Sequence, residues 1–159
     1  MADLLSVDRV RTLPSDLAEL ELPSVKEDFR AVQRLREGWE SGKNRFSGEG
    51  EALFEARYGR RLVAMGGLNR DPYAGSHTVG RIRHLYVLPE LRRRGVGKAM
   101  VAAILEHATL SFDAVVLRTD RAEADSFYVA LGFTRTPGAE AATHVLRLSK
   151  GRAVYGAET

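Results

Sequence analysis

This 159-residue sequence contains no cysteine, which excludes a disulfide framework and a thiol nucleophile. It has no apolar run long enough to span a membrane, and the apolar pair Leu4-Leu5 is soon followed by charged residues, which excludes a signal peptide. Internal repeats and low-complexity segments are also missing. We therefore expect a soluble cytoplasmic chain, with one domain over residues 1–150 and a frayed tail over residues 151–159.

A basic turn with two glycines follows the apolar strand Leu85–Val87 and leads into an apolar helix pattern. The turn spans Arg92–Lys98, with glycines at positions 95 and 97. The first N–H groups of a helix have no partner within it, so glycines at this point let the backbone close around a phosphate. Two other phosphate loops are excluded. A dinucleotide fingerprint needs a third glycine where Met100 stands, and a nucleoside-triphosphate loop needs Ser or Thr where Ala99 stands.

A second block lies one helix and one strand further along, at Ala124–Phe133, and reads A-x-x-x-Y-x-x-L-G-F. Its apolar spacing predicts a short helix that ends at Gly132. Together with R-x-x-G-x-G at Arg92–Gly97, this block resembles the GCN5-related N-acetyltransferases, the GNAT family. The resemblance covers roughly residues 50–148.

The resemblance to the GNAT family implies an enzyme that moves an acetyl group directly from acetyl-CoA to a primary amine of a small molecule, which can be anionic, or of a peptide. Its strand residues would hydrogen-bond the pantetheine through their main chain, and its turn would hold the pyrophosphate. The predicted cofactor-binding residues are Leu85, Tyr86, Val87, Arg92, Arg93, Arg94, Gly95, Val96, Gly97 and Lys98. Tyr128 is the predicted general acid, because a phenol can protonate the departing thiolate; its alternative role is that of a buried core tyrosine.

The general base departs from the family pattern, because the strand positions that often supply it are Arg81 and Arg83 here. His84 is the best remaining catalytic candidate, since imidazole titrates near neutral pH. Strand alternation, however, places His84 on the opposite face from Arg83 and favours a role in the core or on the sheet face. A water chain is an alternative base. Further candidates that the sequence does not rank are Glu51, Glu55 and Asp71.

The residues predicted to contact the acceptor are Arg81, Arg83, Asn69 and Phe46. Two arginines at i and i+2 share one strand face, which favours an acceptor with a carboxylate or a phosphate. Asn69 ends the preceding strand and could hydrogen-bond the acceptor, and Phe46 would cover the site by analogy with the family. The competing interpretation is an exposed strand face on which both arginines pair with acids such as Glu51 or Glu55.

Periodicity and turn residues predict an α+β fold, a GNAT-like single domain with a mixed, mostly antiparallel central sheet and helices on both faces. The expected strands are residues 6–11, 52–58, 61–69, 78–88, 114–117 and 143–148. One helix should begin at Pro23-Ser24, with Val25, Phe29, Val32, Leu35 and Trp39 on one face. A second helix should bury Val96, Met100, Val101, Ile104, Leu105 and Ala108.

Basic residues concentrate between Arg81 and Lys98 and create a local field that attracts an anion. Nucleic acid is not the expected partner, because no aromatic platform or second basic helix accompanies them. Neither a membrane partner nor a metal site is expected, and a homodimer stays open. The alternative function is a non-catalytic acyl-CoA-binding sensor or binding module. Both functions include coenzyme binding, but only the enzyme would release free thiol when an amine is supplied.

Overall fold

The protein folds around one twisted sheet, described here from a computed structural model that covers residues 4–149 and the backbone of residues 152–153. The strand order is β1-β2-β3-β4-β5-β7-β6. The strands are β1 (Leu5–Val10), β2 (Ala52–Tyr58), β3 (Arg61–Arg70), β4 (Val79–Val87), β5 (Ala114–Leu117), β6 (Thr134–Arg135) and β7 (His144–Ser149). Only the β4–β5 pair in this order is parallel. The predicted mixed, mostly antiparallel sheet is therefore confirmed.

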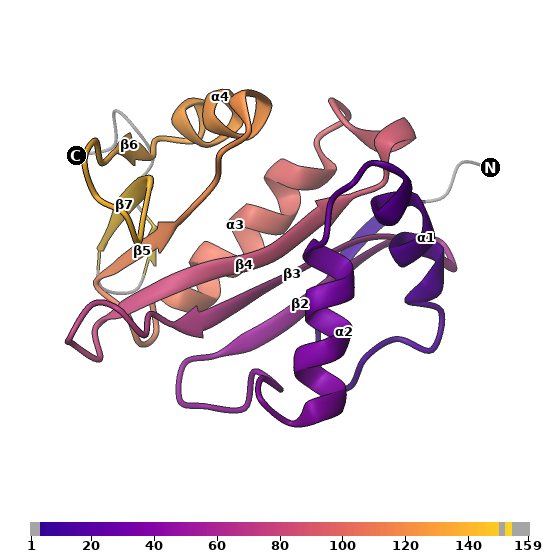
Figure 1. Cartoon of the computed structure of the whole chain (residues 1–159), viewed down its shortest axis with the longest axis horizontal. Helices are drawn as coiled ribbons and strands as arrows, with labels where there is room; N and C mark the ends of the chain where they lie inside the picture. Colours follow the sequence, from indigo (N-terminus) through magenta and orange to yellow (C-terminus); the bar gives the residue numbers. More distant parts are fainter. Residues whose placement is uncertain (1–3, 150–151, 154–159) are drawn as a thin grey trace.

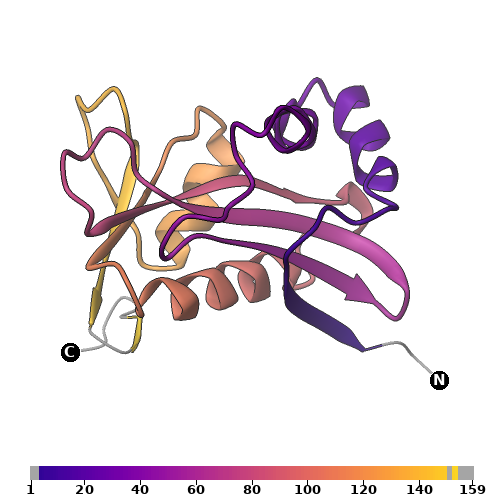
Figure 2. The same ribbon diagram turned by 90° about the horizontal axis from the view of Figure 1, so that it is seen from below.

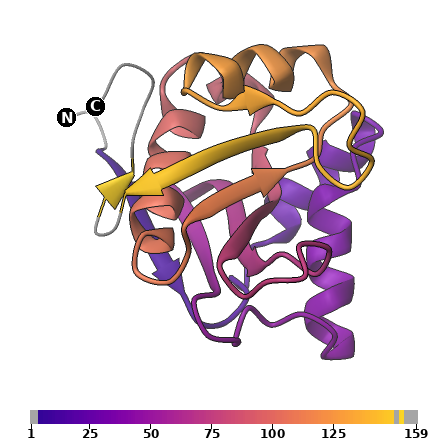
Figure 3. The ribbon, with the colours of Figure 1, turned by 90° about the vertical axis from the view of Figure 1, so that its left-hand side faces the viewer.

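Helices cover both faces of the sheet, as expected. They are α1 (Ala18–Lys26), α2 (Ala31–Ser41), α3 (Val96–Ala108) and α4 (Ala122–Ala130), with a short 3₁₀ turn at Pro89–Leu91. Helices α1 and α2 lie on one face, and α3 runs under the other (Figures 1 and 2). From the side, β5 and β7 lie next to each other at the end of the sheet that also carries α4 (Figure 3). No helix in the described part of the chain is long and apolar enough to cross a membrane.

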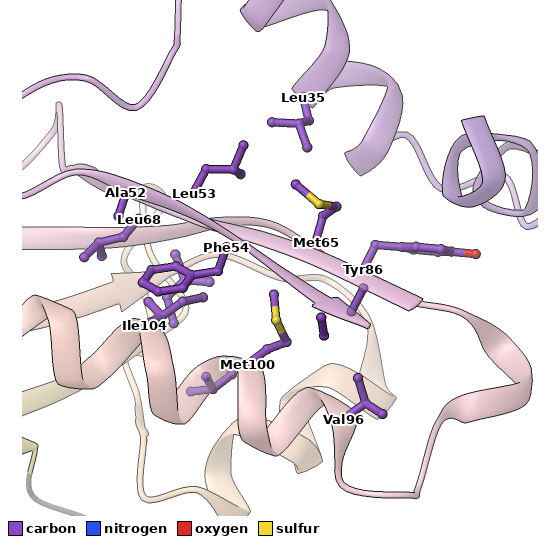
Figure 4. Packing of buried hydrophobic residues seen from close by; sticks show 14 of the residues in the cluster. Leu35, Ala52, Leu53, Phe54, Met65, Leu68, Tyr86, Val96, Met100 and Ile104 are labelled. Atoms are coloured by element: carbon purple, nitrogen blue, oxygen red, sulfur yellow. The ribbon is translucent and has the colours of Figure 1, made fainter. Parts of the chain in front are cut away.

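Helix α3 has the apolar stripe that its sequence predicts. All six residues expected to be buried are buried, with exposed fractions of 0–1%. Figure 4 shows Met100 and Ile104 of this stripe on the α3 side of the sheet, with Leu35 of α2 on the opposite side. Each of these large apolar side chains contributes about 1.5–3 kcal/mol when it is removed from water, so packing on both faces of the sheet stabilises the fold.

The single helix expected to begin at Pro23-Ser24 is wrong, because the chain forms two helices there. Helix α1 begins earlier, at Ala18, and contains Pro23 in its interior. Burial of Leu17 and Leu20 under this segment extends the helix ahead of the proline, so tertiary packing outweighs the local start signal. The break between α1 and α2 is made at Asp28, whose φ is +58°.

The expected tail at residues 151–159 is wrong at Arg152–Ala153. These two residues form the short strand β8, which pairs with the end of β7. Main-chain pairing with β7 explains why these two residues form a strand, because an edge of β7 offers free hydrogen-bonding groups at that point. The remaining residues of the expected tail lie outside the described part of the chain.

Strand β4 contains a β-bulge that decides which side chains share a face. Met65 pairs with Tyr86 and Gly67 pairs with Arg83, so β4 has one residue more than β3 over this stretch. The extra residue is His84, whose φ of +60° lies in the left-handed region. A bulge shifts the alternation of side chains by one position. This one therefore changes the face assignments that strict alternation predicts.

Candidate active site

Strands β4 and β5 pair only where they begin, which leaves an open edge along the second half of β4. Their register runs from Val79↔Ala114 to Arg81↔Val116 and stops there. We call residues 82–87 the open edge of β4. The Leu88 N–H donates to the Val63 carbonyl on the β3 side, so the N–H and carbonyl of Val87 face the opposite way, where the carbonyl accepts from Arg92 and the N–H faces the gap. An extended ligand with amide groups could complete the sheet at this edge.

The basic turn beyond the open edge presents six consecutive N–H groups, from Arg93 to Lys98, that donate to no acceptor within residues 4–149. The first helical bond of α3 is made by the N–H of Ala99 to the carbonyl of Gly95. Arg93 and Gly95 have φ values of +63° and +86°, which curl the turn. Free N–H groups at the positive end of a helix bind phosphate well.

The two glycines of this turn have different structural roles. A Cβ atom at Gly95 would meet no atom within 4 Å, so this glycine is required by its backbone conformation rather than by space. A Cβ atom at Gly97 would lie 3.2 Å from the ring of Phe127 in α4. Gly97 therefore allows α4 to approach α3 closely, a role that the sequence did not indicate.

Of the four basic side chains in the turn, Arg92 is already engaged within the protein. Its Nη1 and Nη2 donate to the two carboxylate oxygens of Glu27 at 2.7 and 2.9 Å, and its Nε donates to the Val87 carbonyl at 3.0 Å. The Tyr86 hydroxyl donates to the same carboxylate. These donors hold the pKa of Glu27 below its usual value, despite the opposing effect of desolvation. Arg93, Arg94 and Lys98 are exposed and have no ion pair within the described residues.

The bulge places Arg83 and His84 on the same face of the sheet, which corrects the expectation from strict alternation. Arg83 lies directly opposite Gly67, and a Cβ atom on Gly67 would point at the Phe46 ring, 2.3 Å away on the α2 side. Opposite residues in an antiparallel pair share a face, so Arg83 also points to the α2 side. His84 is on this side too, edge-on to Phe46 with ring centroids 6.3 Å apart.

The surroundings of His84 keep its imidazole neutral. Burial, followed by the positive charges of Arg83 and Arg34, lowers the pKa of His84 to about 4. The ring is therefore unprotonated at neutral pH and free to accept a hydrogen bond. A group with so low a pKa is a weak base, which differs from the titration near neutrality that the sequence suggested.

Two residues predicted to contact the acceptor are instead occupied by the protein. The Arg81 guanidinium is buried, donates to Asp71 at 2.7 Å and to the Ala141 carbonyl, and lies over the Tyr73 ring. The Asn69 side chain exchanges two hydrogen bonds with Asn44, of 2.8 and 2.9 Å. Asn69 thereby holds the loop that carries Phe46, and Phe46 remains as an apolar wall of the site.

The carboxylates considered as bases are all engaged within the fold. Glu51 accepts from the backbone N–H groups of Gly48 and Arg70, and Glu55 accepts from Arg57. Asp71 is only 6% exposed in its ion pair with Arg81. The competing interpretation, in which Arg81 pairs with Glu51 or Glu55, is therefore wrong, because Arg81 pairs with Asp71.

Tyr128 is buried in α4, but its hydroxyl is not satisfied by the protein. Its ring lies against Phe127, Phe133 and His144, with centroids 5.0, 5.3 and 6.0 Å away. The hydroxyl makes no hydrogen bond within the described residues, where no fully buried side-chain oxygen or nitrogen lacks a partner. The hydroxyl is therefore not fully buried, although Tyr128 as a whole is only 6% exposed. Burial raises the pKa of Tyr128, so the phenol keeps its proton at neutral pH.

Sequence reasoning missed a clamp that holds α4 against β7. Hydrogen bonds with Arg135 and His144 lower the pKa of Asp125 to about 2, so its carboxylate accepts from His144 Nε2 at 2.8 Å. His144 Nδ1 then accepts from the Thr143 hydroxyl, also at 2.8 Å. The clamp orients the helix that carries Tyr128. Its only sequence signal was the position of Asp125 inside the second block.

An open strand edge, a turn of free N–H groups and a nearby phenol define a protein suited to an extended, phosphate-bearing acyl donor. Residues 15–133 match the Acetyltransferase (GNAT) family. This chain belongs to the GNAT family and is an acetyltransferase. No curated protein sequence matches it.

Solved structures agree with this assignment. A candidate acetyltransferase of Exiguobacterium sp. 255-15 is 34% identical, with a TM-score of 0.79 over 90% of this chain and 93% of that chain. The glucosamine-6-phosphate N-acetyltransferase of Arabidopsis thaliana is similar in fold, at 14% identity and a TM-score of 0.54 over 80% and 89% of the two chains. So is the ribosomal-protein-S18-alanine N-acetyltransferase of Escherichia coli, at 15% identity and a TM-score of 0.59 over 89% of each chain.

Proposed function

We propose that this acetyltransferase moves an acetyl group directly from acetyl-CoA to a primary amine of a small molecule or a peptide. The observation that carries the proposal is the continuity of the open edge of β4 with the N–H groups of Arg93–Lys98. The pantetheine amides would pair with the main chain of Leu85 and Val87, and the pyrophosphate would accept from the turn. The exposed Arg93, Arg94 and Lys98 would add charge, while Arg92 holds the edge in shape through Glu27.

The chain contains no cysteine, so transfer is either direct or uses a nucleophile other than a thiol, and we propose that it is direct. The amine attacks the thioester carbonyl, the C–N bond forms, and the C–S bond breaks to release the thiol. A strand N–H at the open edge would stabilise the negative charge that develops on the carbonyl oxygen. Tyr128 would donate its proton to the sulfur as the C–S bond breaks, because the phenol stays protonated near neutral pH, and the phenolate would then regain a proton from solvent.

His84 would orient the attacking amine rather than serve as a strong base. Its unprotonated imidazole lies beside Arg83 and can accept a hydrogen bond from the amine. The nearby positive charges also disfavour an ammonium ion at this place and so favour the nucleophilic free amine. The proton lost after attack would pass through His84 or a water chain to solvent.

A thiol-release screen with acetyl-CoA tests the proposal. The acceptors are amino acids, polyamines, aminoglycosides and peptides, and acetylated products are identified by mass spectrometry. We expect release of free thiol that depends on one class of amine. Acetyl-CoA binding measured by calorimetry, without turnover on any amine, would instead favour a binding module and contradict the proposed reaction.

A further inference from the structure

Two arginines near His84, one on β4 and one on α2, have no counter-ion within the described residues. Arg83 comes from β4 and is half-buried, and Arg34 comes from α2 and is exposed. Helix α2, which carries Arg34, packs against β4, which carries Arg83. Their charges both act on the His84 ring. Neither guanidinium has an ion pair or a side-chain hydrogen bond within the described residues.

Arg83 differs from most arginines that lack an ion pair in the described residues, because it is half-buried rather than exposed. The arginines with carboxylate partners in the described residues are Arg36, Arg57, Arg61, Arg81, Arg92, Arg118 and Arg135. Asp71 and Glu27 are also engaged, since Asp71 pairs with Arg81 and Glu27 pairs with Arg92. Two like charges beside a half-buried ring raise the energy of the free protein, and an anion placed between them lowers it.

We propose that Arg34 and Arg83 bind the carboxylate or phosphate group of an anionic amine acceptor. This inference rests on the proposed function, and it names the chemical class of the acceptor. The anion would lie between α2 and β4, and the amine would lie beside His84, toward the open edge of β4. The buried ring of Phe46 forms an apolar wall next to this place. Arg81 has no part in the site, because Asp71 neutralises it.

Matched pairs of acceptors that differ only in the anion test this assignment. Amino acids are compared with their amides, and phosphoethanolamine is compared with ethanolamine. The first comparison tests recognition of a carboxylate, and the second tests recognition of a phosphate. We expect kcat/KM to be at least about tenfold higher for the anionic member of one pair. Arg34→Ala and Arg83→Ala should each raise KM for that acceptor about tenfold and leave the neutral member unchanged. Arg147→Gln removes an exposed charge from β7 and should change neither value.

A second readout does not require turnover. The pKa of His84 is followed by NMR in the wild-type protein, in both variants, and in the presence of inorganic phosphate or glycine. We expect the pKa to rise when either arginine is removed and when the anion binds. Equal kinetics for neutral and anionic acceptors, or an anion that leaves His84 unmoved, would overturn the inference. An anion that raises the His84 pKa in a protein that acetylates no amine would uphold the site but refute the proposed function.

Discussion

Removing the Tyr128 hydroxyl should separate catalysis from stability. If the phenol hydrogen-bonds the leaving sulfur, Tyr128→Phe should lower kcat about 10²-fold, which corresponds to about 2.7 kcal/mol of activation free energy. The free energy of unfolding should change by less than about 0.5 kcal/mol, because the hydroxyl has no partner within the described residues to leave unsatisfied. Acetyl-CoA affinity should be unchanged.

Tyr86→Phe is the matched control for this prediction. The Tyr86 hydroxyl donates to the Glu27 carboxylate, so its removal should cost about 1–1.5 kcal/mol of stability, a value reduced by the partial exposure of Glu27. The two variants are compared by urea unfolding and by thiol release with the identified acceptor. Wild-type turnover of Tyr128→Phe, or a loss of stability equal to that of Tyr86→Phe, would show that Tyr128 is a structural residue.

Three more predictions concern groups whose roles the structure separates. Asp71→Ala should lower the free energy of unfolding, measured with urea, by ~3–5 kcal/mol because it leaves Arg81 buried without its counter-ion. Glu90→Ala, which removes an exposed ion pair, should lower it by less than ~1 kcal/mol. Equal losses in the two variants would contradict this prediction. Gly95→Ala should lower the free energy of unfolding by about 1–2 kcal/mol, because residue 95 has a φ of +86°. The same substitution should weaken acetyl-CoA binding. Unchanged affinity in calorimetry would argue against the turn as a phosphate site. Because the His84 pKa falls to about 4 on folding, the unfolded state binds the extra proton between pH 6.5 and 4, so stability should decrease as pH falls through this window. A His84→Gln variant with the same pH dependence would refute that sign.

Local sequence patterns were sufficient to predict the sheet, helix α3 and the positions of both GNAT motifs. The stripe of α3 is set by contiguous residues, and the turn Arg92–Lys98 joins a strand to a helix without any distant contact. Positions of this kind can be predicted because the backbone geometry depends on neighbours only a few residues away. The same reasoning located Tyr128 on a short helix.

Tertiary contacts decided which of these side chains are available for chemistry. One extra residue at His84 moved it to the face of Arg83, and the alternation rule contains no signal for a bulge. Glu27 reaches Arg92 across 65 residues, and Asp71 removes Arg81 from the site by burial and charge pairing. Charge partners depend on which segments the core brings together, so the free energy of burying each charge is settled only when the whole sheet has formed.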